Sequence, residues 1–197
     1  GHGIRYLNLG GGLGITYRDE APPLPSDYAA AILPAVRDLG CTLLFEPGRV
    51  IVGNAGILVT RVLYAKAKEE KRFVIIDAGM NDLIRPALYE SYMEARPVEE
   101  AAAQRPRHKS DLVGPVCESG DYLAKDRMLP EYRRGDLVAI MSAGAYGFAM
   151  ASNYNSRPRP PEVLVRGGEY YVIRRRESYE DLILGESIPA FIAGEGK

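Results

Sequence analysis

Residues 4–49 read as strand, glycine loop, helix and strand, and this order restricts the fold more than any other feature of the chain. A buried-strand pattern over residues 4–9 runs into the glycine loop Gly10–Gly14, and a proline-rich connection follows at residues 22–25. After Ser26, apolar residues recur at helical spacing until Gly40. A second strand, residues 41–45, ends at the turn Glu46-Pro47-Gly48-Arg49. Two strands joined by a helix predict a parallel unit.

Both polar loops of this unit follow the carboxyl end of a strand, which is the edge where barrels and open sheets of this class bind ligands. A single parallel unit of about fifty residues cannot close a sheet or bury both of its faces. Residues 1–54 are therefore expected either to dock on the rest of the chain or to be one piece of a larger α/β domain.

The pattern changes to a mainly β one after about Gly53. Residues 57–66 and 72–77 are rich in apolar strand formers and flank the polar turn Glu69–Lys71, which predicts an antiparallel hairpin. Short helices are expected at residues 86–95 and 178–184. Residues 55–197 are thus predicted to form a second, antiparallel β domain, a barrel or a sandwich. Its further strands are expected at residues 112–116, 136–141, 162–166 and 169–174.

Composition excludes several classes of function. The formal net charge of −1 gives no general attraction to nucleic acid or to an anionic membrane. No apolar run approaches the ~20 residues of a membrane helix, and no signal peptide is visible, so a cytoplasmic location is expected. The two cysteines do not suggest a disulfide scaffold, and His2 and His108 lack metal-ligand spacing. The chain starts without Met, which suggests a fragment of a longer protein.

Two of the polar clusters lie in the first segment. The loop at Gly10, Gly11 and Gly12 can cradle a phosphate with its backbone N–H groups, although glycine loops are often simple turns. At the second cluster, Glu46 could hold a heteroaromatic nitrogen protonated, while Arg49 could bind a phosphate or carboxylate through its planar fork. The alternative at the second cluster is a surface turn with a local ion pair.

Three further clusters lie in the β region. Arg85 and Tyr89 would share a helix face and could grip a carboxylate, or could be an exposed Arg and a half-buried Tyr. Cys117 precedes Glu118 in a loop bounded by glycines and could donate a proton, or could be a small buried side chain. Tyr146 follows a strand in a small-residue turn, where its hydroxyl could bind a phosphate or simply belong to a β-turn.

Taken in this order, the motifs resemble those of the diaminopimelate decarboxylases, which are pyridoxal-phosphate enzymes of the alanine-racemase-like fold. The resemblance spans nearly the whole chain. The glycine loop and the Glu-Pro-Gly-Arg turn are shared with ornithine and arginine decarboxylases, whereas the segment around Arg85 and the Glu after Cys117 are more specific. The motifs that carry it are Asn8–Ile15, Glu46–Arg49, Asp77–Tyr89, Gly114–Asp121 and Gly144–Gly147.

This resemblance implies a role for each cluster. The cofactor phosphate would be held by Gly10, Gly11, Gly12 and Tyr146, and the turn Glu46-Pro47-Gly48-Arg49 would bind the cofactor, with Glu46 facing its pyridine nitrogen. Arg49, Arg85 and Tyr89, together with Tyr146, would bind the substrate on its distal carboxylate side. Glu118 would bind the distal amino group, and Cys117 would donate the proton. A homodimer with a shared active site is implied, since Cys117 and Glu118 reach the partner's site in this family.

The chain departs from the family in one respect. The family's Schiff-base lysine and its cofactor-stacking histidine lie well upstream of the glycine loop, whereas here no lysine precedes Gly12. The chain therefore resembles the last part of a (β/α)8 barrel, residues 1–54, followed by the β domain, residues 55–197. The implied reaction is decarboxylation of meso-diaminopimelate to L-lysine, the last step of lysine biosynthesis. The alternatives are a related ornithine-, arginine- or carboxynorspermidine-type decarboxylase, and a non-catalytic dimerising β module.

The missing lysine gives a direct test. When these 197 residues alone are incubated with pyridoxal phosphate, we expect no absorbance band from a cofactor bound covalently to a single lysine, and no activity. Absorbance spectroscopy measures the band. A band stoichiometric with the protein would overturn the assignment of the lysine to another part of the protein.

Overall fold

The computed structural model describes residues 3–193, which form two compact units divided between Ala151 and Ser152. Each unit is considered by itself. The predicted domain boundary at residues 54/55 falls inside the first unit and stays a prediction. Within the described residues, no helix combines the length and the apolar character that a membrane crossing requires.

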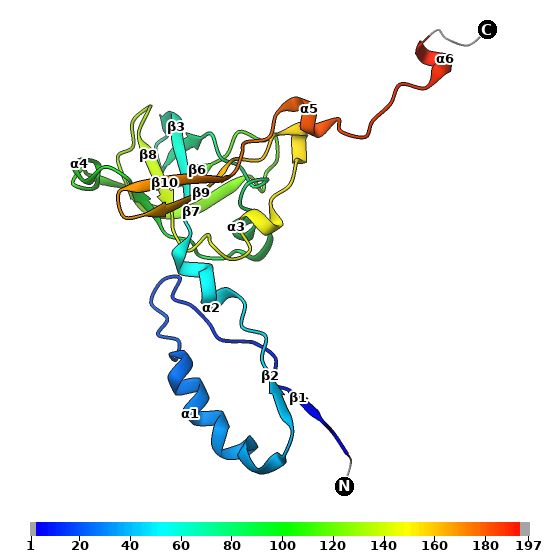
Figure 1. The fold of residues 1–197 in the computed structure, drawn as a ribbon. Helices are drawn as coiled ribbons and strands as arrows, with labels where there is room; N and C mark the ends of the chain where they lie inside the picture. Colours follow the sequence, from blue (N-terminus) through cyan, green and yellow to red (C-terminus); the bar gives the residue numbers. More distant parts are fainter. Residues whose placement is uncertain (1–2, 194–197) are drawn as a thin grey trace. The chain divides into compact units, whose positions relative to one another are not determined.

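The first unit begins with the expected parallel βαβ arrangement. Strands β1 (Tyr6–Asn8) and β2 (Thr42–Leu44) pair in parallel, and helix α1 (Pro25–Val36) connects them (Figure 1). Pro25 stands at the first helical position, where a missing N–H costs nothing, and the Asp27 carboxylate accepts a hydrogen bond from the backbone N–H of Leu24. A short 3₁₀ turn, η1 (Arg37–Leu39), then ends at Gly40 in the left-handed conformation. The parallel unit predicted from the sequence is confirmed.

The β region is one six-stranded sheet with the strand order β5-β8-β3-β4-β6-β7. Helix α2 (Arg49–Val52) and the 3₁₀ turn η2 (Gly53–Ala55) lead from β2 into it. The edge strands β5 and β7 also contact each other, so the mixed sheet is nearly closed. The strands are β3 (Leu58–Ala67), β4 (Arg72–Ile76), β5 (Ala95–Pro97), β6 (Arg107–Val113), β7 (Tyr122–Pro130) and β8 (Leu137–Ile140).

The expectation of a purely antiparallel domain is wrong at one strand pair. The β3–β4 hairpin is antiparallel as predicted, but β4 and β6 pair in parallel, with Val74 opposite Leu112. A parallel pair needs a long crossover connection, and residues 77–106 supply one. That connection contains α3 (Arg85–Tyr89), β5 and α4 (Glu100–Ala103). The predicted helix over residues 86–95 is therefore shorter, and it ends where Glu90 adopts a left-handed φ of 52°.

The core of the sheet is formed by side chains that alternate along the strands. Val74 and Ile76 of β4 and Val138 and Ile140 of β8 are almost fully buried, as period-two alternation requires. Further core residues are Val62, Leu83, Met93, Leu112 and Leu123. Leu83 and Met93 come from the β4–β6 connection, so the same core fixes the segment that carries Arg85.

The predicted strand over residues 112–116 is shifted in the structure. Strand β6 begins at Arg107 and ends at Val113, because the next residues turn around one buried carboxylate. Asp121 accepts a hydrogen bond from the backbone N–H of Val116 at 2.6 Å, and its own carbonyl accepts one from Gly114. The first unit closes after β8 with the 3₁₀ turn η3 (Phe148–Met150).

The second unit contains the predicted hairpin of β9 (Glu162–Arg166) and β10 (Glu169–Arg174), with Gly167 at a φ of 60° in the turn. A 3₁₀ turn, η4 (Tyr154–Ser156), precedes the hairpin, while α5 (Tyr179–Leu182) and α6 (Ala190–Ala193) follow it. The large apolar side chains of the hairpin are exposed within the described chain. Polar contacts therefore contribute much of what orders this unit.

Glu177 is the centre of those contacts. Its carboxylate accepts hydrogen bonds from the Arg159 guanidinium, at 2.8 Å from Nε, and from the Arg159 backbone N–H, also at 2.8 Å. The side chain of Asn153 donates a third hydrogen bond. These interactions, led by the Arg159 side chain, lower the pKa of Glu177 from 4.5 to about 2.

The lowered pKa predicts how this unit responds to acid. The folded unit binds the Glu177 proton less readily than the unfolded chain, so the stabilisation is complete above pH 4.5 and is lost as pH falls toward about 2. We expect Glu177→Gln to increase hydrogen exchange in residues 152–193 at pH 7 and to remove this part of the acid dependence. Glu186→Gln, at an exposed carboxylate, is the matched control. Equal exchange in the two variants at pH 7 would contradict the assignment.

Candidate active site

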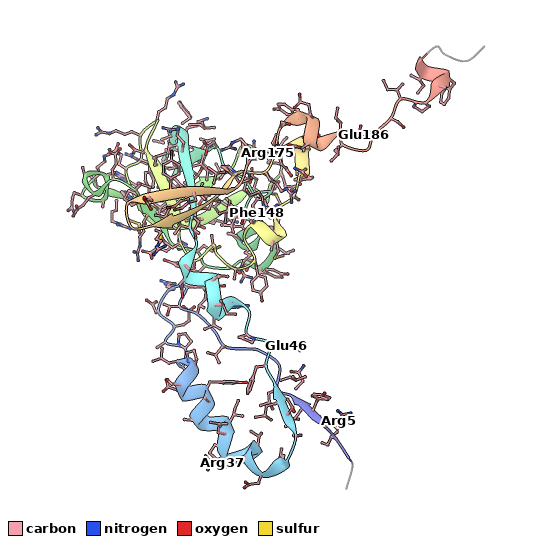
Figure 2. All side chains as sticks on the ribbon, in the orientation of Figure 1. Arg5, Arg37, Glu46, Phe148, Arg175 and Glu186 are labelled. Atoms are coloured by element: carbon pink, nitrogen blue, oxygen red, sulfur yellow. The ribbon has the colours of Figure 1, made fainter. Side chains whose placement is uncertain are left out.

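The glycine loop and the Glu46 turn meet at the carboxyl ends of β1 and β2. The backbone N–H of Leu9 donates to the carbonyl of Leu44, and the N–H of Glu46 donates to the carbonyl of Gly10 at 2.8 Å. Asn8 joins both segments, since its side-chain oxygen accepts from the Gly10 N–H and its amide donates to the Glu46 carboxylate at 2.5 Å. Figure 2 shows Glu46 where the chain leaves β2.

Gly11 is the point of closest approach between the two segments. A Cβ atom at this position would lie 2.3 Å from the carbonyl oxygen of Glu46, a distance that no side chain tolerates. Gly10 and Gly12 have φ angles of 71° and 93°, which L-residues rarely adopt. Close packing therefore requires glycine at position 11, backbone conformation favours it at positions 10 and 12, and the loop brings its backbone beside Glu46.

Tyr146 reaches the same region from the turn after β8. Its hydroxyl lies 3.3 Å from the position that a Cβ of Gly48 would occupy. Tyr146 and Ser142 have left-handed φ angles of 59° and 58°, which are strained for residues other than glycine and persist only where surrounding contacts enforce them.

Those contacts come from the segment that leads into β3. A Cβ on Gly144 would lie 1.9 Å from the carbonyl oxygen of Val52, and a Cβ on Gly56 would lie 2.4 Å from the Cα of Gly144. The side-chain amide of Asn54 donates to the Ser142 hydroxyl and to the carbonyl of Thr16, at 2.8 Å each. Backbone packing between glycines thus fixes the Tyr146 turn on the Glu46–Arg49 side of the unit.

Two arginines and three tyrosines form what we term the arginine–tyrosine cluster: Arg49, Arg85, Tyr17, Tyr89 and Tyr146. The guanidinium carbons of Arg49 and Arg85 each lie 5.5 Å from the centroid of the Tyr146 ring. They lie 5.8 Å and 5.6 Å from the centroid of the Tyr17 ring. Arg85 is also 5.6 Å from the Tyr89 ring. These distances are in the range of cation–π interactions.

The charges of the two arginines are not balanced within the described chain. Neither Arg49 nor Arg85 forms an ion pair with a carboxylate among residues 3–193. Arg85 is 8% exposed, donates one hydrogen bond to Ser91, and has a buried Nε without a partner in the same range. Two guanidinium groups that share the same tyrosine rings and have no carboxylate partner are suited to bind an anion.

Cys117 and Glu118 are exposed on the loop between β6 and β7. Asp121 orders this loop, because its buried carboxylate also accepts a hydrogen bond at 2.6 Å from the backbone N–H of Met80, in the segment that leads to Arg85. Gly114 allows the carboxylate to pack against the backbone, since a Cβ there would lie 2.3 Å from an oxygen of Asp121. No hydrogen bond joins Cys117 to the arginine–tyrosine cluster within the described part of the chain.

The structure therefore brings most of the predicted site residues together. The glycine loop lies beside Glu46, and Gly48, Arg49 and Arg85 lie beside Tyr146. Arg85 also contacts the Tyr89 ring. Pro47 lines an apolar cavity next to Gly10 and Gly11, whose other walls include Tyr28, Ile32 and Phe45. Cys117 and Glu118 lie on a separate loop. Among the described residues, no group of three or more His, Cys, Asp and Glu side chains is placed to hold a metal ion.

Sequence reasoning missed four residues that the geometry makes important: Asn8, Tyr17, Asn54 and Asp121. Asn8 and Asp121 stand within the recognised motifs, but nothing local shows that their side chains bridge distant segments. Tyr17 and Asn54 contact residues that lie 32 to 88 positions away in the chain. Only the spacing of Tyr17, a few residues after the glycine loop, could have drawn attention to it.

Comparison with known proteins gives a consistent result. The family model described as the pyridoxal-dependent decarboxylase C-terminal sheet domain matches residues 19–144. A diaminopimelate decarboxylase from Pseudomonas aeruginosa is 56% identical over 188 residues, which cover 95% of this chain and 45% of that protein. A diaminopimelate decarboxylase from Vibrio cholerae is 53% identical over 188 residues, covering 94% of this chain and 44% of that protein.

Solved structures agree with these matches. The crystal structure of diaminopimelate decarboxylase from Helicobacter pylori, complexed with L-lysine, is 46% identical and has a TM-score of 0.84, covering 91% of this chain and 44% of that one. The chain spans somewhat less than half the length of the relatives it matches.

Proposed function

This chain belongs to the pyridoxal-dependent decarboxylase family, and from that premise we propose that it is part of a diaminopimelate decarboxylase. The proposed reaction removes one carboxyl group of meso-diaminopimelate as carbon dioxide and leaves L-lysine. The names of the relatives, at 53–56% identity, support this assignment, as does the L-lysine bound in the Helicobacter pylori structure.

The observation that carries the proposal is the uncompensated pair Arg49 and Arg85. A substrate with a second, distal carboxylate would satisfy both guanidinium groups, whereas ornithine or arginine would bring another positive charge to the same place. Tyr89, whose ring lies beside Arg85, would complete the carboxylate site together with Tyr146. This favours a diacid over the substrates of the related decarboxylases.

The residues present also fit pyridoxal phosphate. The glycine loop offers backbone N–H groups beside Glu46, and the Tyr146 hydroxyl lies near Gly48. Glu46 forms no ion pair within residues 3–193, and Asn8 orients its carboxylate. It is thus free to keep a pyridine nitrogen protonated. When bound, the cofactor would supply an electron-accepting ring for the electron pair that remains after carbon dioxide leaves. The proposal assigns the Schiff-base lysine to a part of the protein outside this chain.

Cys117 would then provide the proton that replaces the lost carboxyl group. Its thiol would donate that proton to the substrate carbon, and Glu118 would bind the distal amino group. The exposure of both residues on a loop ordered by Asp121 supports a role at a surface shared with a second subunit. We therefore propose a homodimer in which each subunit's Cys117 and Glu118 complete the site of its partner. A cytoplasmic location stays a prediction.

Substitution of Arg85 tests the proposed substrate. In the complete gene product, Arg85→Gln should raise KM for meso-diaminopimelate by about 10- to 100-fold, since a charge-assisted hydrogen bond to the distal carboxylate is lost. Steady-state kinetics measure KM. Arg134→Gln, at an exposed arginine of the β7–β8 connection, is the matched control and should leave KM unchanged. Equal effects of the two substitutions, or an Arg85 variant with wild-type KM, would disprove the role of Arg85.

The shared active site predicts complementation between two inactive variants. Subunits carrying Glu46→Gln and subunits carrying Cys117→Ala should each be inactive as homodimers. After subunit exchange in a 1:1 mixture, about one quarter of the wild-type activity should return, because half of the dimers are mixed and each of these has one intact site. Activity that stays at the sum of the two parents would show that Cys117 serves the site of its own subunit.

A further inference from the structure

Tyr17 is held in place by its neighbours on both sides. The Glu20 carboxylate accepts hydrogen bonds from the backbone N–H groups of Tyr17 at 2.9 Å and Arg18 at 2.7 Å. The Thr16 hydroxyl donates to the Glu20 carbonyl, and the Thr16 carbonyl accepts from Asn54. Ile15 is buried against Gly53, where a Cβ would come within 2.5 Å of it. The backbone of Tyr17 is therefore fixed relative to the segment that follows Arg49.

The Tyr17 ring lies near both guanidinium groups of the arginine–tyrosine cluster, at 5.8 Å from Arg49 and 5.6 Å from Arg85. The two guanidinium groups that share these rings carry like charges, which repel each other, and no carboxylate pairs with either of them within residues 3–193. Within the same range, the faces of the Tyr17 and Tyr146 rings are the groups of negative potential shared by both cations. Loss of either ring would let the two guanidinium groups separate.

The cluster also contains unmet hydrogen-bonding capacity. The Arg85 Nε is buried and has no hydrogen-bond partner among the described residues. It can donate a hydrogen bond, and buried donors are almost always paired in a complete site. The group that Arg85 lacks is an acceptor, which agrees in chemical class with a carboxylate.

We propose that Tyr17 is a positioning residue for substrate specificity, and this rests on the proposed function. Its ring, which lies within cation–π range of both guanidinium groups, holds Arg49 and Arg85 in place to bind one distal carboxylate. It is a tyrosine of the barrel segment, whereas Tyr89 and Tyr146 come from the sheet region, so the geometry of the carboxylate site depends on both segments.

The test compares three variants of the complete gene product loaded with pyridoxal phosphate. Tyr17→Leu removes the ring and should raise KM for meso-diaminopimelate about tenfold while kcat changes by less than about twofold. Tyr17→Phe keeps the ring and should hold KM within about threefold of wild type. Tyr64→Leu, at an exposed tyrosine of β3 outside the cluster, is the matched control and should behave as wild type. Calorimetric binding of pimelate, the diacid without amino groups, should weaken about tenfold in Tyr17→Leu alone.

The outcomes separate this inference from the proposed function. A wild-type protein without activity on meso-diaminopimelate overturns the proposed function, while pimelate binding still tests Tyr17. An active wild type with unchanged KM and pimelate affinity in Tyr17→Leu overturns the role of Tyr17 alone. A Tyr17→Phe variant with tenfold higher KM also overturns it, because the ring would not be the group that matters. If Tyr17→Leu does not fold, the Tyr17→Phe result decides.

Discussion

Close backbone packing between glycines is the constraint on which the candidate site depends. Gly56 and Gly144 touch at distances that exclude any side chain, and Gly144 also packs on the Val52 carbonyl. This contact joins the segment that follows α2 to the turn that carries Tyr146. Gly11 packs in the same way against the backbone carbonyl of Glu46. The functional side chains are thus positioned by backbone surfaces, which are stiffer than contacts between flexible side chains.

Two cations of the sheet region pair with carboxylates, whereas Arg49 and Arg85 form no such pair within the described residues. In the sheet, Lys71 pairs with Asp111 at 2.6 Å, and this hydrogen bond raises the pKa of Lys71. Arg105 likewise pairs with Asp136, which raises the pKa of Arg105. Arg49 and Arg85 lie in the same unit without such partners in its described residues. This lack of a carboxylate partner is the feature that, in the proposed function, suits Arg49 and Arg85 to bind an anionic ligand.

Much of the fold could be predicted from local sequence. The parallel βαβ unit follows from helical spacing between two apolar strands, and the β3–β4 and β9–β10 hairpins follow from polar or glycine turns. The parallel β4–β6 pair could not be predicted, because nothing in either strand encodes its neighbour across the connection at residues 77–106. The candidate site likewise contains residues that local sequence predicts and residues that it does not. Glu46 and Arg85 stand in recognisable motifs, whereas the position of Tyr17 is set by contacts with residues far along the chain.

The Asp121 carboxylate orders more than its own loop. One carboxylate group clamps the loop of Cys117 through Val116 and, through Met80, the segment that ends at Arg85. In the proposed dimer, the loop of Cys117 would serve the active site of the neighbouring subunit. The segment that ends at Arg85 would bind substrate in the active site of its own subunit. One carboxylate would therefore help to position residues of both active sites, and its removal would disturb the two sites of the dimer together.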